Sequence, residues 1–252
     1  MPSTEIPLGT IQQVQSLRSS VTEALRNAII LGDLEEGELY SAPALAAPLG
    51  VSATPVREAM MDLAREGLVI TAKNKGFRVT SMTSEDLEEQ TQVRQLLEGP
   101  AMRAVAGQIP AEDLQELRRR ADVITEAAET GDLRTYITED RAFHAALVAH
   151  TRNSRLVDLT LRLRGQTRMR ALRALADTGR LTASSREHHQ LLDLLEAGDA
   201  EGAYELTIQH IGHASRLWAT GAEENGPDDS RSGKSAEAAQ IDLVPRSARS
   251  VT

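Results

Sequence analysis

From Thr83 to about Thr220, apolar residues recur at helical spacing in every segment between two turn signals. The expected helices are Ser84–Gly107, Pro110–Gly131, Asp132–His150, Asn153–Asp177, Ala183–Ala197 and Ala200–Thr220, with Ser84 and Asn153 as N-caps. Six helices joined by short loops predict an all-α helical bundle over residues 83–220. The composition agrees, because 40% of the residues are hydrophobic and only 2% are aromatic. A core of Leu, Ala, Ile and Val favours packed helices over a β-sandwich.

The segment from residue 11 to residue 80 has another organisation. A helix ends at Gly32, and a short apolar stretch follows at Leu45–Leu49. The next helix opens with Thr54 as its N-cap and Pro55 at its first position. Its expected buried residues are Val56, Ala59, Met60 and Leu63, and two strands, Leu68–Thr71 and Gly76–Thr80, follow as a β-hairpin. This order predicts an N-terminal winged helix-turn-helix domain, in a chain that is mostly α.

The helix that starts near Ser52 is the candidate recognition helix. A helix-turn-helix places the first residues of its second helix against base edges in the major groove. Ser52 and Thr54 can donate hydrogen bonds to DNA, and Arg57 lies one turn in, on the solvent side, placed for guanine or phosphate. The hairpin tip adds a basic wing, in which a glycine permits close backbone approach. The predicted DNA-binding residues are Ser52, Thr54, Arg57, Lys73, Lys75 and Gly76.

Charge and composition restrict the partners of the chain. A formal net charge of −9 argues against nucleic acid when it is averaged over the chain, but Lys73 to Arg78 contains three basic residues and no acidic one. The absence of cysteine excludes disulfides and thiolate metal sites. No signal peptide and no run of eighteen apolar residues is found, so we expect a soluble cytoplasmic protein without a membrane partner. Residues 221–252 are polar and are expected to be a disordered tail.

Three histidines and one aspartate fall on inward faces of the expected bundle. Asp140 and His144 are four residues apart, so they share a helix face and can bind one ion together. His188 and His210 lie on the apolar stripes of two other helices. One carboxylate and three neutral imidazoles suit a divalent transition metal. By spacing alone, four unrelated histidine and aspartate side chains, hydrogen-bonded in the core, would explain the same pattern.

Two other histidines test this assignment. His189 shares a helix face with Asp193 and Glu196, so it should meet solvent. His213 lies partly on the same stripe as His210 and competes with it as a ligand.

The N-terminal part resembles the GntR family of transcription regulators. The resemblance is carried by Leu31–Leu34, Gly37–Leu39, the run Leu49–Met60, Leu63, Glu66–Val69 and the wing Gly76–Val79. Three departures stand out. Ala53 replaces an arginine that commonly touches DNA in the family, and Ala42 and Pro43 replace polar or charged residues. Pro48 lies inside the helix before the turn, where it removes a backbone hydrogen bond. These departures imply an altered operator sequence and lower affinity.

The helical part is similar to the FCD ligand-binding domain of the FadR-type branch of that family. Together, the two resemblances cover about residues 14–218. It is carried by Arg94, Glu98, Asp140, Phe143-His144, Asn153, Glu187-His188, Gly198-Asp199 and His210. The resemblance implies that Asp140, His144, His188 and His210 hold a metal, zinc or a similar divalent ion, in a central cavity. A small carboxylate would complete the coordination, and Arg94 would line the cavity. Arg103, Arg164 and Arg168 are weaker candidates, since most arginines from Arg162 to Arg173 are expected on a solvated or dimer-facing surface.

The resulting hypothesis is a ligand-responsive regulator, a repressor by preference, that binds a double-stranded DNA operator as a homodimer and responds to a small organic acid. An alternative is a metal-dependent enzyme acting on a small carboxylate. The sequence has no general base at a telling spacing, no Ser-His-Asp arrangement and no glycine-rich phosphate loop, so we do not expect an enzyme. A third possibility keeps the regulator but makes the metal structural or absent, with a larger acyl ligand in the bundle.

Overall fold

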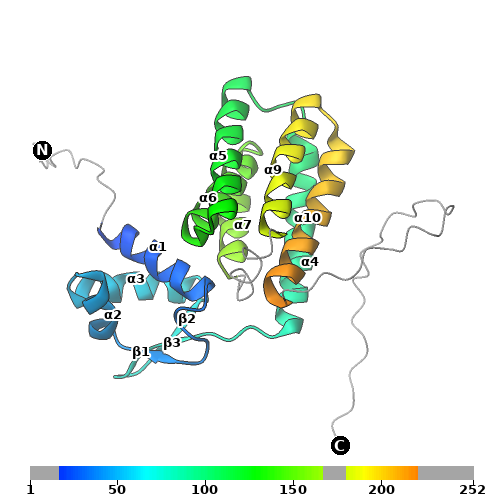
Figure 1. Ribbon diagram of the computed structural model, residues 1–252. Coiled ribbons are helices and arrows are strands. Elements are labelled where there is room, and N and C mark those ends of the chain that lie inside the picture. The colour runs from blue at the N-terminus through cyan, green and yellow to red at the C-terminus, as the bar shows by residue number, and fades with distance from the viewer. Residues whose placement is uncertain (1–16, 167–179, 221–252) are drawn as a thin grey trace, which may run out of the picture. The chain divides into compact units, whose positions relative to one another are not determined.

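The computed structural model describes residues 17–166 and 180–220, without the side chains of residues 180 and 214–220 (Figure 1). The N-terminal domain contains α1 (Leu17–Ile30), β1 (Leu39–Tyr40), α2 (Ala42–Leu49), α3 (Ala53–Arg65), β2 (Val69–Ala72) and β3 (Gly76–Val79). The three strands form an antiparallel sheet in the order β1-β3-β2. The predicted winged helix-turn-helix is confirmed, and the short strand β1 is an element that the sequence pattern did not indicate.

Local residue chemistry explains where α2 and α3 begin. Ser41 caps α2 by accepting a hydrogen bond from the Ala44 amide, and Gly50 ends this helix with φ 65°. The expected N-cap at Thr54 is wrong by two residues, because Ser52 is the N-cap and α3 starts at Ala53. Pro55 therefore lies inside the first turn of α3, where the amides have no helical acceptor and proline costs no hydrogen bond.

Gly76 is required by the close approach of β1, a role that the sequence did not predict. Its φ is +129°, and a Cβ atom there would lie 2.2 Å from the carbonyl oxygen of Tyr40 on β1. Only glycine fits this position without moving the backbone of the paired strand. The glycine thus closes the three-stranded sheet, whatever its role against DNA.

The helical bundle contains α4 (Ser84–Val105), α5 (Ala111–Thr130), α6 (Leu133–Ala149), α7 (Ser154–Gln166), α9 (Arg180–Ala197) and α10 (Ala200–Thr220). The first cap differs from expectation: Thr83, one residue earlier than Ser84, forms a capping box with Asp86. Asn153 accepts the Leu156 amide, as expected of an N-cap. The part of the expected Asn153–Asp177 helix beyond Gln166 lies outside the described residues, as does the expected tail.

Two apolar cores organise the described residues. One core lies between α1, α2, α3 and the sheet, and contains the predicted face Val56, Ala59, Met60 and Leu63. The other fills the bundle, where α4 packs along α10 and α5 packs against α6 and α9. Both domains belong to one compact unit. In residues 17–166 and 180–220, no helix combines the length and the apolar character needed to cross a bilayer.

Candidate functional site

The four residues expected to bind a metal come together inside the bundle. Asp140 and His144 lie one turn apart on α6, His188 lies on α9 and His210 on α10. All four are between 1% and 4% exposed. One potential ligand atom from each lies within 4.8 Å of those of the other three. Three helices therefore bring an Asp-His-His-His set to one buried point.

Hydrogen bonds set which ring nitrogens face this point. The Nδ1 atom of His188 lies 2.9 Å from the carbonyl oxygen of Ser185, which can only accept, so Nδ1 carries the proton. The Nε2 atom of His188 then has a free lone pair, 3.2 Å from Asp140 Oδ1 and 3.2 Å from His144 Nε2. In this tautomer the Nε2 atom of His188 is an acceptor that faces the Asp140 carboxylate, a pattern that a bound cation would stabilise.

His210 is oriented by a carboxylate that the sequence did not single out. Its Nδ1 atom donates to Glu187 Oε2 at 2.6 Å, so its Nε2 atom is the unprotonated one. This Nε2 atom is buried and has no hydrogen-bond partner among the described residues. A buried acceptor without a donor is unfavourable, and a metal ion is one group that would satisfy it. The arrangement of carboxylate, histidine and free nitrogen is that of a metal ligand held by its neighbour.

Electrostatics favour the protonation states that a metal requires. Burial lowers the pKa of His144 and of His210, and the Arg164 guanidinium lowers that of His144 further. Burial by itself would raise the pKa of Asp140, but the Arg164 guanidinium holds it well below its usual range. The imidazoles of His144 and His210 are therefore neutral and the Asp140 carboxylate is ionised at neutral pH, which is the ligand form of each group.

Two buried arginines and a glutamate stand beside the four residues. The Nε atoms of Arg94 and Arg164 donate to the two oxygens of Glu98, at 2.8 and 3.1 Å. Arg164 also donates through Nη1 to Asp140 Oδ2 at 2.9 Å. The two guanidinium groups outweigh the effect of burial on Glu98 and lower its pKa to about 2. The set is thus a network of two cations and two anions in the bundle core.

Several buried polar atoms in this part of the bundle have no hydrogen-bond partner within residues 17–166 and 180–213. Both terminal nitrogens of Arg94 and the Nη2 atom of Arg164 are buried without a hydrogen-bond partner among the described residues. The hydroxyl groups of Tyr136, Thr160 and Ser184 are buried and unpartnered as well. The free fork of Arg94 matches the bidentate geometry of a carboxylate.

Arg164, one of the weaker candidates, lies beside the metal-ligand set and not on the surface expected for most arginines of its helix. It is 5% exposed and contacts Asp140 and Glu98, rather than lying on a solvated surface. Of the other candidates, Arg103 is part-exposed and pairs with Glu201, and Arg168 lies outside the described residues.

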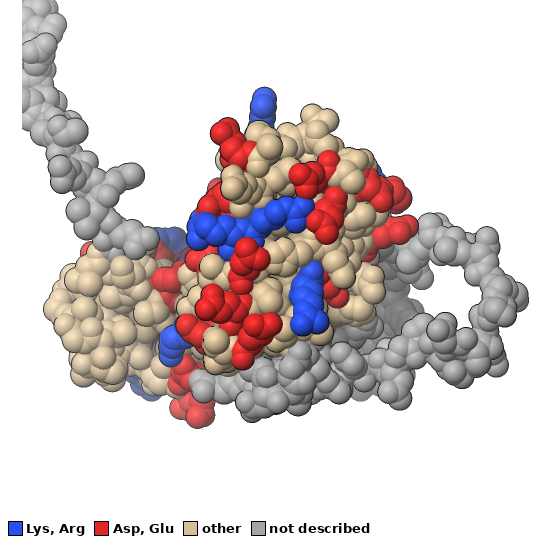
Figure 2. Space-filling view, turned by 45° about the horizontal axis from the view of Figure 1, so that its top comes forward, with Lys and Arg blue, Asp and Glu red and all other residues tan. Residues whose placement is uncertain are grey.

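His189 and His213, the two other histidines considered above, lie outside the metal-ligand set. His189 is partly exposed and its Nε2 atom lies 3.3 Å from Asp122 Oδ1, outside the metal-ligand set. His213 is about half exposed, with its Nδ1 atom 3.6 Å from Glu187. The residues that share a face with His189 pair with an arginine instead, since Arg118 contacts both Asp193 and Glu196. Figure 2 shows this kind of surface, with acidic and basic side chains close together.

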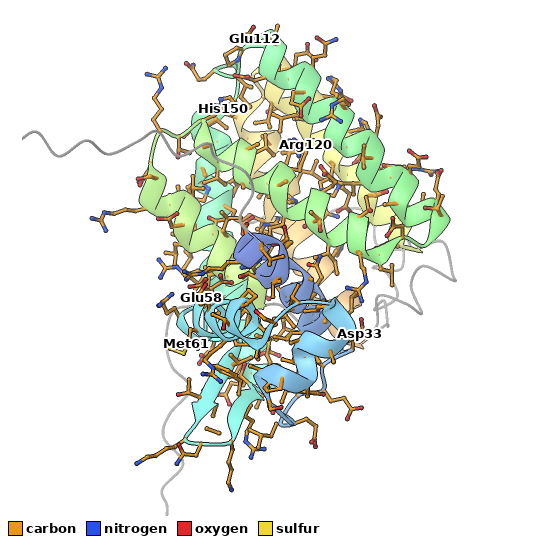
Figure 3. The ribbon with its side chains drawn as sticks, turned by 90° about the vertical axis from the view of Figure 1, so that its left-hand side faces the viewer. Asp33, Glu58, Met61, Glu112, Arg120 and His150 are labelled. Atoms are coloured by element: carbon orange, nitrogen blue, oxygen red, sulfur yellow. The ribbon has the colours of Figure 1, made fainter. Side chains whose placement is uncertain are left out.

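The predicted DNA-binding residues lie at two exposed places of the winged helix. Ser52, Thr54 and Arg57 are exposed at the start of α3, and Lys73 and Lys75 are exposed in the turn between β2 and β3. Gly76 is half-buried beneath β1. Further along α3, Glu58 and Met61 lie at the outer surface of the domain (Figure 3).

Comparison with known proteins accounts for both domains. The model of bacterial regulatory proteins of the gntR family matches residues 17–79, and the FCD domain model matches residues 89–213. The chain is 32% identical over 216 residues to a probable D-xylose utilization operon transcriptional repressor from Paenarthrobacter nicotinovorans, covering 84% of this chain and 93% of the relative. It is 28% identical to the transcriptional regulator McbR of Escherichia coli, over 74% and 86% of the two chains. The solved structure of E. coli McbR/YncC superposes with a TM-score of 0.68 at 26% identity, covering 79% of this chain and 95% of that one.

Proposed function

The chain belongs to the gntR family of bacterial regulatory proteins, and from this premise we propose that it is a metal-dependent, ligand-responsive repressor. Like its named relatives, it is a transcriptional regulator and not an enzyme. In the proposal, the FCD domain binds a divalent metal and a small organic acid, and their binding changes the affinity of the winged helix for operator DNA. The protein would act in the cytoplasm, where bacterial DNA lies.

The orphaned Nε2 atom of His210 is the observation that carries the metal proposal. Asp140, His144, His188 and His210 would hold the ion, and their nitrogen and oxygen donors suit zinc or a neighbouring divalent metal. A bound metal would supply positive charge for a ligand carboxylate. The rival in which the bundle holds an acyl ligand without metal leaves two buried acceptor nitrogens, His188 Nε2 and His210 Nε2, unexplained.

The unpartnered guanidinium nitrogens support an anionic effector. Arg94 presents two free N–H groups on one edge, which suits a carboxylate, and Arg164 presents a third. Both side chains are at least 95% buried, so an anion bound there would interact in a low-dielectric interior. We therefore assign a small organic acid as effector, with Arg94 as its main partner.

The DNA-binding part of the proposal rests on exposure and residue type. Arg57 lies at the start of the recognition helix, and the wing presents Lys73 and Lys75. Each winged helix would contact one half-site, so a two-fold operator requires a homodimer. Exposed apolar residues of neighbouring helices, Val93 and Leu96 on α4 and Leu159 on α7, offer a surface for the second copy. Light scattering tests this, since a monomer that retains full operator binding would contradict it.

The central test measures metal content and effector response together. Purified protein should contain about one divalent ion per chain by elemental analysis, and His210→Ala or His144→Ala should abolish it. His189→Ala is the matched control and should keep the metal, because His189 pairs with Asp122 outside the set. A panel of organic acids should then raise the melting temperature of the metal-loaded protein. Arg94→Ala should lose this thermal shift, whereas the exposed Arg103→Ala should retain it. Metal retained by His210→Ala but lost by His189→Ala would refute the site.

A further inference from the structure

Three consecutive residues at the end of α7 touch both the candidate metal centre and the recognition helix. Arg164 points into the bundle, where it donates to Asp140 and Glu98. A Cβ atom on Gly165 would lie 3.9 Å from the Glu66 carboxylate, just past the end of α3. Gln166 donates through Nε2 to the backbone carbonyl oxygen of Glu66 at 2.6 Å. One turn of helix thus connects the two functional regions.

Glu66 is the residue that ends the recognition helix. It is the C-cap of α3, where carbonyl groups lack a helical donor, so the Gln166 amide supplies a missing partner. Its carboxylate accepts from Nε of Arg26 at 3.1 Å and from Nη2 at 2.7 Å. Arg26 lies on α1 and is 5% exposed. The C-terminal end of α3 is therefore held from one side by α1 and from the other by α7.

Gln166 is itself held by the helix that carries Arg94. The Nε2 atom of Gln90 on α4 donates to Gln166 Oε1 at 3.2 Å and to the Leu163 carbonyl oxygen at 2.9 Å. Gln90 is 6% exposed and lies one turn before Arg94. These contacts fix the Gln166 amide with its nitrogen toward Glu66, because its oxygen is occupied by a donor.

We propose that the turn Arg164–Gln166 couples the metal and effector centre to the recognition helix, with Gln166 as its positioning residue. The inference rests on the proposed function and names the regulation of the same site. Arg164 donates to Asp140 Oδ2 and Glu98 Oε2, and its Nη2 atom has no hydrogen-bond partner among the residues that the structure describes. A cation bound to Asp140 would weaken the hydrogen bond between Arg164 Nη1 and Asp140 Oδ2. An effector carboxylate would accept a new hydrogen bond from Arg164 Nη2. Because residues 164–166 form one helical turn, a shift of Arg164 moves Gln166 and hence the end of α3.

Hydrogen exchange of the full-length protein, with zinc as the probe, tests this coupling. Zinc should change the exchange of the amides of residues 66–68, at the end of α3, by about fivefold or more in the wild type. In Gln166→Ala the change should disappear, while zinc affinity by chelator competition stays within about twofold. Gln166→Glu keeps the size of the side chain but removes the donor, so it should behave in the same way.

Gln95→Ala is the matched control for the loss of a part-buried amide. Its Nε2 atom donates to the Ile208 carbonyl oxygen at 3.0 Å, a bond of the same kind that joins α4 to α10 inside the bundle. This variant should keep the zinc response at residues 66–68. An unchanged response in both Gln166 variants, or a wild type that binds zinc without any response there, would overturn the coupling and leave the metal site standing. A wild type that does not bind zinc would refute the proposed function and the coupling with it.

Discussion

The winged helix and the helical bundle place their polar functional side chains in opposite environments. In the winged helix, Arg57 and the wing lysines are exposed, and the core beneath them is apolar. In the bundle, Asp140, its three histidine partners and two arginines lie in the core itself, nearly without contact to solvent. The candidate DNA surface can therefore vary without disturbing the fold, whereas the candidate ligand centre is part of what holds the bundle together.

This difference follows from the cost of burying charge. An exposed side chain on a surface helix contributes little to stability, so only its contacts with DNA constrain it. A buried charge is tolerated only when an opposite charge and hydrogen bonds compensate it. Arg94 and Arg164 are balanced by Glu98 and Asp140, so each residue of this network supports the others. Mutations in the two regions should therefore differ in kind, and five experiments can sharpen or break the contrast.

The largest effect is expected at Glu98. Glu98→Ala leaves both Arg94 and Arg164 short of their shared carboxylate and should lower the free energy of unfolding by about 3–5 kcal/mol. Glu58→Ala, on the outer surface of α3 (Figure 3), should change it by less than about 0.5 kcal/mol. Chemical denaturation of the two variants measures both values, and equal losses would break the comparison.

Acid titration gives a second view of the same carboxylate. The pKa of Glu98 is about 2 in the folded chain, below the 4.5 expected without the fold. Between these values the unfolded state binds the proton first, so the contribution of Glu98 is complete above pH 4.5 and is lost toward pH 2. Glu98→Gln should flatten this part of the curve of stability against pH.

The next effect is expected in DNA recognition. Arg57→Ala should reduce discrimination between operator and mismatched DNA by about 1–3 kcal/mol, if its guanidinium makes a bidentate base contact. Lys73→Ala should instead weaken binding to all sequences and lower the salt dependence by about one ion. Gel-shift titrations at several salt concentrations separate the two. Neither variant should alter the melting temperature, and unchanged affinity and selectivity in Arg57→Ala would show that the recognition helix is wrongly placed.

A somewhat smaller effect is expected from Glu187, behind His210. Without the carboxylate, the His210 ring loses its orientation and tautomer, so Glu187→Ala should reduce zinc affinity by about 10–100-fold. Glu187→Gln should recover part of this, because an amide oxygen still accepts from Nδ1. His213→Ala removes only the exposed neighbour of Glu187 and serves as the control. A loss of affinity in the control alone would make His213 the ligand.

The smallest effect concerns pH. Burial lowers the pKa of His144 and His210. Protons should therefore compete with the metal for these imidazoles only at a pH well below about 6.5, the ordinary histidine pKa. In the metal-free protein, the unfolded state binds protons first in this range. Its free energy of unfolding should therefore fall as the pH drops below about 6.5. Chelator competition and thermal melting on both sides of this pH measure the two effects.

Much of the fold could be predicted because it depends on local geometry. Apolar spacing and turn residues predicted the bundle helices to within a few residues, apart from the part of Asn153–Asp177 beyond Gln166, which lies outside the described residues. The buried face of α3 followed from the same periodicity. Asp140 and His144 are four residues apart, so they share a face of any α-helix that contains both, whatever the fold. The cap of α3 was misplaced because Ser52, Thr54 and Pro55 are all acceptable near a helix start, and only the backbone conformation distinguishes them.

The sequence by itself determined which side chains turn inward, since helical periodicity is set by the backbone within a few residues. It did not determine what they meet there. That Arg164 contacts Asp140, that Glu187 orients His210, and that Gln166 caps the recognition helix are all consequences of how separate helices pack. The partners in these pairs lie between 23 and 100 residues apart in the chain. No local spacing encodes such contacts, because they arise only when the apolar faces of distant helices are buried against each other.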